Sequence, residues 1–310
     1  MLMIITLSRD DNMQTVAQYV KKPILRLDWD REDMSDMLLL FSNGTFNTLI
    51  AGVDPSEITA VWFRIAYLSY FQPANEPFWL FNRLSREELI RIMFSELEHA
   101  NWVSHPFNMQ RAENKVLQMK IAQELGFSMP DTLISGSIAE AESFRESIGK
   151  SNLIVKPLVH QAVKSGEKLY GMYTSRVTPT QPVDFQLLPN CPAIFQAEVD
   201  RKCDIRTIVV GDRVFSIEIH QVGEATGGVD YRKVKPKDLV YNPHFLPADL
   251  EEKCVSLVKR LGLKYGAIDF VLGKDGVYYF LENNPSGAWK YVADNGNHAI
   301  QQAFADIFNG

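Results

Sequence analysis

Short apolar runs alternate with amphipathic segments along the first 108 residues of the chain. The stretch 85–103, SREELIRIMFSELEHANWV, has the apolar spacing of a long helix that closes this region. Such alternation is typical of a small α/β lobe, and we expect one over residues 1–108. Runs with the length and composition of strands occupy 3–7, 23–28, 37–41 and 58–64.

Helical spacing dominates the next part of the chain. A helix is expected over 112–126, because its apolar residues recur at helical intervals and Gly126 is a usual C-terminal stop. A second helix is expected from Ser137, which has capping-box spacing to Glu140. These elements predict a central lobe over residues 109–185. Strand-like runs flank the second helix at 129–135 and 152–158.

Residues 186–310 are rich in strand-like runs and end in a helical segment. Helices are expected near 247–262 and 294–308. With the two preceding regions, this C-terminal lobe predicts an α/β (α+β) chain of three lobes. Strands are expected within 193–199, 204–220 and 265–283.

Oxygen-bearing side chains gather at the end of the last strand run. Glu282 and Asn284 stand two positions apart, so a strand would point both to the same face. If the preceding turn centres on Lys274–Asp275, Asp269 lies opposite Phe280 and diagonal to Glu282. Three hard oxygen donors on one face favour binding of Mg²⁺, whose coordination sphere is normally completed by substrate phosphates. The alternative for Asp269 is a buried acid satisfied by backbone groups, and a one-residue slip of the hairpin would put it on the other face. E-x-N alone also suits a polar strand end.

Two lysines are candidates for holding those phosphates. Lys156 ends an apolar run immediately before a proline, and Lys115 opens a helix, where an ordinary surface lysine is the alternative. Lysine serves phosphate as a point charge. The polar crossing that follows the strand at 193–199 can present backbone groups, with Gln196 or Glu198, to a nucleotide base.

Two acid–arginine pairs alternate along predicted strands and loops. Asp204 and Arg206 share a face, and so do Asp230 and Arg232 after a glycine-rich loop. The planar guanidinium of Arg232 suits a substrate carboxylate. A plain surface ion pair of little energetic value is the alternative for Asp204 and Arg206.

Charge and cysteine content narrow the class of protein. The net charge of −6 without a basic block argues against a nucleic-acid partner and favours a small molecule or a peptide. Cys191, Cys203 and Cys254 lack the spacing of a zinc site or a disulfide framework, which suits reduced thiols in the cytoplasm. The N-terminal apolar run of seven residues is too short for a signal peptide or a membrane span. We therefore expect a cytoplasmic protein without a membrane partner.

In this order, the motifs between about 110 and 290 resemble the ATP-grasp superfamily. They are more narrowly similar to the MvdD/MvdC-type microviridin ligases, the graspetide synthetases, and this likeness extends over nearly the whole chain. The motifs that carry it are VWFR at 61–64, IVKPL at 154–158, FQAEV at 195–199, DIRTIVVGD at 204–212, VDYR at 229–232 and LENNPSGAW at 281–289.

The resemblance implies an ADP-forming ligase with a pre-ATP-grasp N-terminal lobe and a nucleotide between the central and C-terminal lobes. Such enzymes use ATP and Mg²⁺ to join Asp or Glu side chains of a ribosomal precursor peptide, with leader and core, to Ser/Thr hydroxyls or Lys amines. A homodimer is compatible with it. By motif, Lys115 and Lys156 become phosphate binders, Gln196, Ala197, Glu198, Val199 and Asp204 nucleotide contacts, Arg206, Asp230 and Arg232 catalytic residues, and Asp269, Glu282 and Asn284 metal ligands.

Other functions and some departures from the family pattern stay open. A RimK-like ligase of free amino acids or protein C-termini, or a nucleotide-binding scaffold without turnover, would carry similar motifs. Ile65 stands where relatives often have a second basic residue, and Asn283 where they have an aliphatic one, which leaves the substrate subtype open. A hairpin expected over 163–177, with Tyr170 and Tyr173, is a candidate docking surface for a leader segment.

Overall fold

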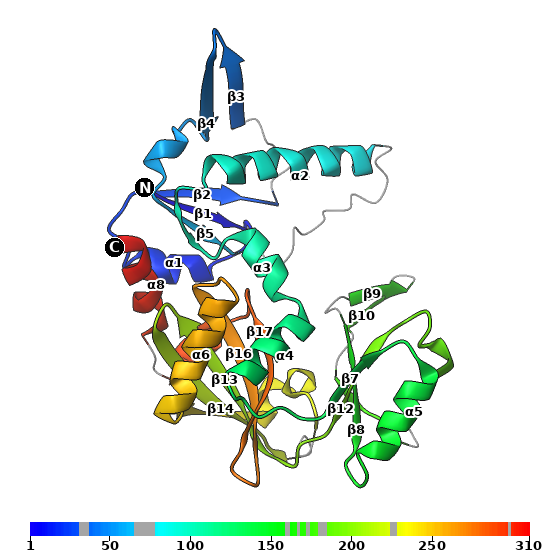
Figure 1. Ribbon diagram of the computed structural model, residues 1–310. Helices are drawn as coiled ribbons and strands as arrows, with labels where there is room; N and C mark the ends of the chain where they lie inside the picture. The colour runs from blue at the N-terminus through cyan, green and yellow to red at the C-terminus, as the bar shows by residue number, and fades with distance from the viewer. Residues whose placement is uncertain are drawn as a thin grey trace.

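The computed structural model describes most of the chain and shows three lobes (Figure 1). Ile65 and Tyr173 lie outside the described residues, as does the side chain of Tyr170. No helix within the described ranges is long and apolar enough to cross a bilayer. The described ranges are 1–30, 37–64, 78–158, 162–165, 168–171, 174–178, 185–223, 228–296 and 299–310.

The N-terminal lobe is built on a parallel four-stranded sheet of order β2-β1-β5-β6. The central strands β1 and β5 are buried along their whole length, as expected for a parallel sheet covered on both faces. The expected helix over 85–103 is wrong at its end, because α2 stops at Glu96 and residues 101–103 form the edge strand. The elements are β1 Leu2–Thr6, α1 Asn12–Ala17, β2 Ile24–Asp28, a projecting hairpin of β3 Met37–Ser42 and β4 Thr45–Ile50, η1 Pro55–Glu57, β5 Ala60–Phe63, α2 Trp79–Glu96 and β6 Asn101–Val103.

The central lobe is a sheet of order β11-β8-β12-β7 with α5 packed against it. The capping spacing at Ser137 is confirmed, because its hydroxyl accepts the Glu140 amide at 3.3 Å. Gly126 follows the helix with a φ of +72°, which favours glycine. The helices that precede this sheet, α3 Pro106–Ala112 and α4 Lys115–Glu124, pack on the core shared with the C-terminal lobe and not on the central sheet. The elements that follow are β7 Thr132–Ser135, α5 Ile138–Ser147, β8 Leu153–Pro157, β9 Ala162–Ser165, β10 Lys168–Gly171, β11 Ser175–Arg176, η2 Phe185–Leu187 and β12 Ala193–Ala197.

The C-terminal lobe is an antiparallel sheet of order β15-β14-β13-β16-β17. The single helix expected at 294–308 is wrong, since α7 ends at Gly296 and α8 begins at Ile300. The elements are β13 Arg201–Val210, β14 Arg213–Gln221, η4 Tyr231–Lys233, η5 Pro236–Asp238, β15 Leu239–His244, α6 Ala248–Arg260, β16 Tyr265–Gly273, β17 Tyr278–Asn284, α7 Lys290–Gly296 and α8 Ile300–Asn309.

The hydrophobic core joins the N-terminal and C-terminal lobes into one body. One cluster contains Met3 and Phe94 with Phe270, and another packs Trp62 against Phe304. The central lobe has a separate, smaller core around Leu153 and Phe195 in the described residues. A cleft between the central lobe and the rest of the molecule is therefore bounded by two independently packed bodies.

Candidate active site

The three predicted metal ligands meet on the β16–β17 hairpin, in a register different from the expected one. Asp269 pairs with Glu282, not with Phe280, because the register shifts and Phe270 takes Phe280 as its partner. Leu281 is thus the extra residue of a β-bulge. The bulge places the two carboxylates directly across from each other, closer than the diagonal arrangement predicted.

Asn284 completes this set of oxygen donors. Its side-chain nitrogen donates to Asp269 Oδ2 at 3.0 Å and to Glu282 Oε1 at 3.3 Å. Rotation of the amide by half a turn would present its oxygen to the same two carboxylates. The three side chains therefore supply the hard oxygen ligands that Mg²⁺ prefers, and they fit such an ion.

Each of these carboxylates is matched by a cation from another element. Arg206 NH1 donates to both oxygens of Asp269 at 2.8 Å, because β13 pairs with β16 with these two residues opposite each other. Lys115 Nζ, at the start of α4, lies 2.7 Å from Glu282 Oε2. Burial acts to lower the pKa of Arg206, but the Asp269 carboxylate and the neighbouring Tyr291 and Tyr231 together hold that pKa well above its ordinary value. The guanidinium is therefore a permanent positive charge in the site.

Lys156 projects from β8 of the central lobe. Its Nζ donates to Gln196 Oε1 at 2.7 Å, and the Gln196 amide nitrogen donates to Thr132 Oγ1 at 2.9 Å. Burial lowers the pKa of Lys156 to about 8, while the Glu282 carboxylate opposes that shift. The lysine is poised to gain an anionic partner.

The Asp204–Arg206 surface pair considered as an alternative is wrong. Both residues are buried, and Arg206 is paired with Asp269. Asp204 Oδ2 lies 3.3 Å from NH1 of Arg201. Burial raises the pKa of Asp204 to about 6, with Arg201 acting in the opposite direction.

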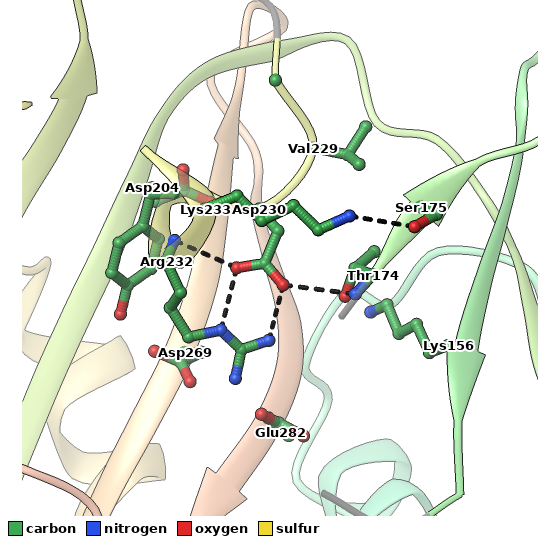
Figure 2. A network of polar contacts seen from close by, with 12 residues as sticks. Lys156, Thr174, Ser175, Asp204, Val229, Asp230, Arg232, Lys233, Asp269 and Glu282 are labelled. Carbon is green, nitrogen blue, oxygen red and sulfur yellow. Dashed lines mark hydrogen bonds and ion pairs between the residues drawn. The ribbon is translucent and has the colours of Figure 1, made fainter. Parts of the chain in front are cut away.

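Asp230 and Arg232 form a forked ion pair on the loop that faces the central lobe (Figure 2). The two N–O distances are both 2.8 Å. Asp230 Oδ2 also accepts the Thr174 amide at 3.2 Å, and Lys233 Nζ donates to Ser175 Oγ at 2.9 Å. This loop therefore bridges the C-terminal and central lobes beside the metal ligands.

Most of the predicted residues line one cavity of about 510 Å³ between the lobes. Lys115 is outside the lining but reaches it through Glu282. The Glu198 side chain also lies outside, because β12 ends at Ala197 and the carboxylate is held by Arg176 and by Asn152. The predicted lining residues are Lys156, Gln196, Ala197, Val199, Asp204, Arg206, Asp230, Arg232, Asp269, Glu282 and Asn284.

Several other lining residues were not among the predicted site residues. Ile154 and Leu281 provide apolar walls, and Ile154 could have been found as the residue two positions before Lys156 on the same strand face. Tyr231, Tyr241 and Tyr291 form an aromatic end to the cavity, with the Tyr231 and Tyr291 hydroxyls 3.2 Å apart. Tyr231 lies within VDYR, whereas no local signal marks Tyr241 or Tyr291.

No family model matches the sequence, and no curated protein matches it either. Several solved structures, however, match the chain over almost its whole length. The macrocyclase MdnC of Microcystis aeruginosa MRC, bound with precursor peptide MdnA, is 26% identical, with a TM-score of 0.83 and 99% of each chain covered. A RiPP-associated ATP-grasp ligase of Chryseobacterium gregarium, in complex with ADP and a leader and core peptide, is 25% identical, with a TM-score of 0.82 and coverage of 99% of this chain and 96% of that chain.

A third structure shares the fold at lower similarity. The D-cycloserine synthetase DcsG is 16% identical, with a TM-score of 0.60 over 100% of this chain and 99% of that chain. The likenesses confirm the ATP-grasp fold expected from the motifs. The chain therefore has the ATP-grasp ligase fold, and over almost its whole length it is similar to a RiPP macrocyclase and a RiPP-associated ATP-grasp ligase, in keeping with the resemblance to the graspetide synthetases.

Proposed function

We propose that the chain is an ATP-dependent peptide ligase of ribosomal precursor peptides. It activates Asp or Glu side chains of the core and joins them to Ser/Thr hydroxyls or Lys amines, forming macrocycles. The observation that carries the proposal is a cavity in which the carboxylates of Asp269 and Glu282 lie among several cations. Precursor peptides in the structures of MdnC and of the Chryseobacterium gregarium ligase support a peptide substrate.

The cavity offers separate surroundings for the parts of ATP. Ile154 and Leu281 are apolar walls for the base, and Gln196, Ala197 and Val199 border it from the strand that leads out of the central lobe. Lys156 and Arg206 present positive charge for the phosphates. Asp269, Glu282 and Asn284 would hold Mg²⁺, which neutralises phosphate charge when bound.

Chemistry at the substrate carboxylate requires a better leaving group than oxide. A carboxylate oxygen attacks the γ-phosphorus and ADP leaves. The hydroxyl or amine then attacks the acyl carbon and loses its proton to solvent, and phosphate leaves with that carboxylate oxygen. The protein contributes position and charge to this transfer. Arg232, held by Asp230, is suited to orient the carboxylate. Arg206, held beside Asp269, would supply positive charge for the transferred phosphoryl group.

The test needs a precursor peptide, to be sought among short open reading frames beside this gene as one with a repeated Thr- and Glu-rich core. Incubated with the protein, ATP and Mg²⁺, it should lose the mass of one water for each bond formed, with one ADP released per bond. Hydroxide should open ester rings and spare amide rings. A peptide extended by amino acids would favour the RimK-like alternative, and nucleotide binding without turnover would favour a scaffold.

A further inference from the structure

A second group of metal-ligating side chains lies on the other face of the C-terminal sheet. Cys203 Sγ, a carboxylate oxygen of Glu218 and a ring nitrogen of His220 all lie within 4.8 Å of one another. Asp204 and Arg206 line the active-site cavity, whereas Cys203 and Ile205 belong to the core that contains residues of α6. Strand alternation therefore separates this group from the proposed Mg²⁺ ligands.

The register of β13 and β14 brings the three side chains together. Ile205 pairs with Glu218 and Asp204 with Ile219, so the next position of the ladder sets Cys203 across from His220. Glu218 stands two residues before His220 on the same strand face. Their side chains are in contact, with His220 Nε2 2.7 Å from Glu218 Oε2.

A third strand supports the carboxylate. His244 of β15 places Nδ1 2.9 Å from Glu218 Oε1, and its Nε2 lies 2.9 Å from the Tyr278 hydroxyl of β17. A carboxylate held by a histidine, itself held by a hydroxyl, is the kind of outer support that orients metal ligands. The Glu218 side chain is 23% exposed and that of His220 30%, so an ion can enter from solvent.

The donor set indicates which ion would bind. Sulfur, imidazole nitrogen and carboxylate oxygen together are ligands of Zn²⁺, whereas Mg²⁺ requires oxygen. Zinc bonds of about 2.0–2.3 Å need donors roughly 3–4 Å apart, so shifts of about an ångström would complete the site. The alternative role of Cys203 as a reactive thiol is disfavoured, because the residue is only 1% exposed and burial raises its pKa to about 11.

We propose that Cys203, Glu218 and His220 form a Zn²⁺ site, with His244 positioning Glu218. On binding, the Cys203 thiol gives its proton to solvent and the sulfur bonds to the ion. The site ties β13 to β14 close to Arg206, and it is independent of the ligase activity proposed above.

Cobalt substitution tests the site without any activity measurement. The full chain is first stripped of metal with a chelator and is then titrated with Co²⁺ alone. Co²⁺ binds in zinc sites, and a thiolate ligand bound to it gives a charge-transfer absorption band in the near ultraviolet. We expect that band at one equivalent, displacement by Zn²⁺ and no displacement by Mg²⁺. Cys203→Ala should abolish the band, and His244→Gln should weaken Co²⁺ binding about 10–100-fold.

Matched variants separate ligation from folding. Cys254→Ala removes another buried thiol of the same core, and Cys191→Ala an exposed one, and both should keep the band. His220→Gln changes a partly exposed ligand, should melt like the wild type without metal, and should weaken Co²⁺ binding. Absence of the band in the wild type, or a band that survives Cys203→Ala, would overturn the proposal.

Discussion

Asp230 connects the central lobe to Arg232 through a single carboxylate. Its two oxygens accept from Nε and NH2 of Arg232 at 2.8 Å each, and one of them also accepts the Thr174 amide at 3.2 Å (Figure 2). Asp230 is 5% exposed, so these contacts are largely shielded from water. The orientation of the guanidinium in the cavity is thus tied to the position of the central lobe.

Asp230→Asn should lower kcat/KM for the peptide by about 10–100-fold, because an amide cannot accept the forked pair and a misplaced guanidinium orients the carboxylate poorly. The KM for ATP should change little. Lys233→Met is the matched control, since it removes the neighbouring contact to Ser175 without touching Arg232. Equal losses in both variants would show that bridging the lobes, and not the position of Arg232, is what matters.

Nucleotide binding should weaken as pH rises through about 8, where Lys156 loses its proton in the free protein. The fall in ADP affinity should approach about tenfold per pH unit. Lys156→Arg, which stays charged, should bind ADP with little pH dependence over the same range. A wild-type profile as flat as that of the arginine variant would contradict this role.

The same lysine should affect folding stability with the opposite sign. Its pKa in the folded protein is about 8, against an ordinary value of 10.5, so between these values the unfolded chain binds more protons. The contribution of Lys156 to the free energy of unfolding therefore rises with pH across this window. Urea unfolding should be measured for the wild type and Lys156→Met at several pH values between 8 and 10.5. The free energy of unfolding should rise more steeply with pH in the wild type than in the variant. Parallel plots of that free energy against pH would contradict the depressed pKa.

Glu282→Gln should abolish ligation while the protein stays folded. The substitution removes one of two facing carboxylates and the partner of Lys115, so the ion loses a charged ligand. In thermal melts, Mg²⁺ with ADP should stabilise the wild type well beyond ADP alone, and this difference should vanish in the variant. Retained ligation, or an unchanged Mg²⁺ effect, would remove Glu282 from the metal site.

Local patterns predicted the parts of the site that lie within single strands. The shared face of Glu282 and Asn284 follows from alternation alone. The β-bulge at Leu281 could not be anticipated, because a turn sequence does not determine where a ladder shifts register. The pairing of Lys115 with Glu282 spans 167 positions, and no local pattern encodes it. Strand alternation would place Glu198 on the same face as Gln196, but it holds only within the strand, and β12 ends at Ala197 before Glu198 is reached.

Asn283 is a buried polar residue whose side chain lacks partners in the described part of the chain. It is 0% exposed, and neither amide atom makes a hydrogen bond there, although its backbone pairs with Gln118. Asn283→Leu, of similar shape, should raise the free energy of unfolding by about 1 kcal/mol, because it removes the cost of an unpaired amide. Urea unfolding measures it, and destabilisation would contradict the prediction.

Gly266→Ala is the matched control for that site. A Cβ at Gly266 would lie 2.4 Å from Asn283 Oδ1 and 2.6 Å from Val258 Cγ2, so alanine should destabilise by about 1–3 kcal/mol through overpacking. The double variant should be less stable than Asn283→Leu alone by the same about 1–3 kcal/mol, since leucine leaves no more room. A double variant as stable as Asn283→Leu alone would show that the pocket relaxes.

The fate of one carboxylate oxygen tests the central claim most directly. A precursor peptide whose core Asp and Glu side chains carry ¹⁸O is incubated with the protein, ATP and Mg²⁺, and the released phosphate is analysed by mass spectrometry. Activation as an acyl-phosphate predicts ADP and one labelled oxygen in phosphate for every bond formed. Bonds formed with unlabelled phosphate, or with AMP and pyrophosphate as products, would contradict it.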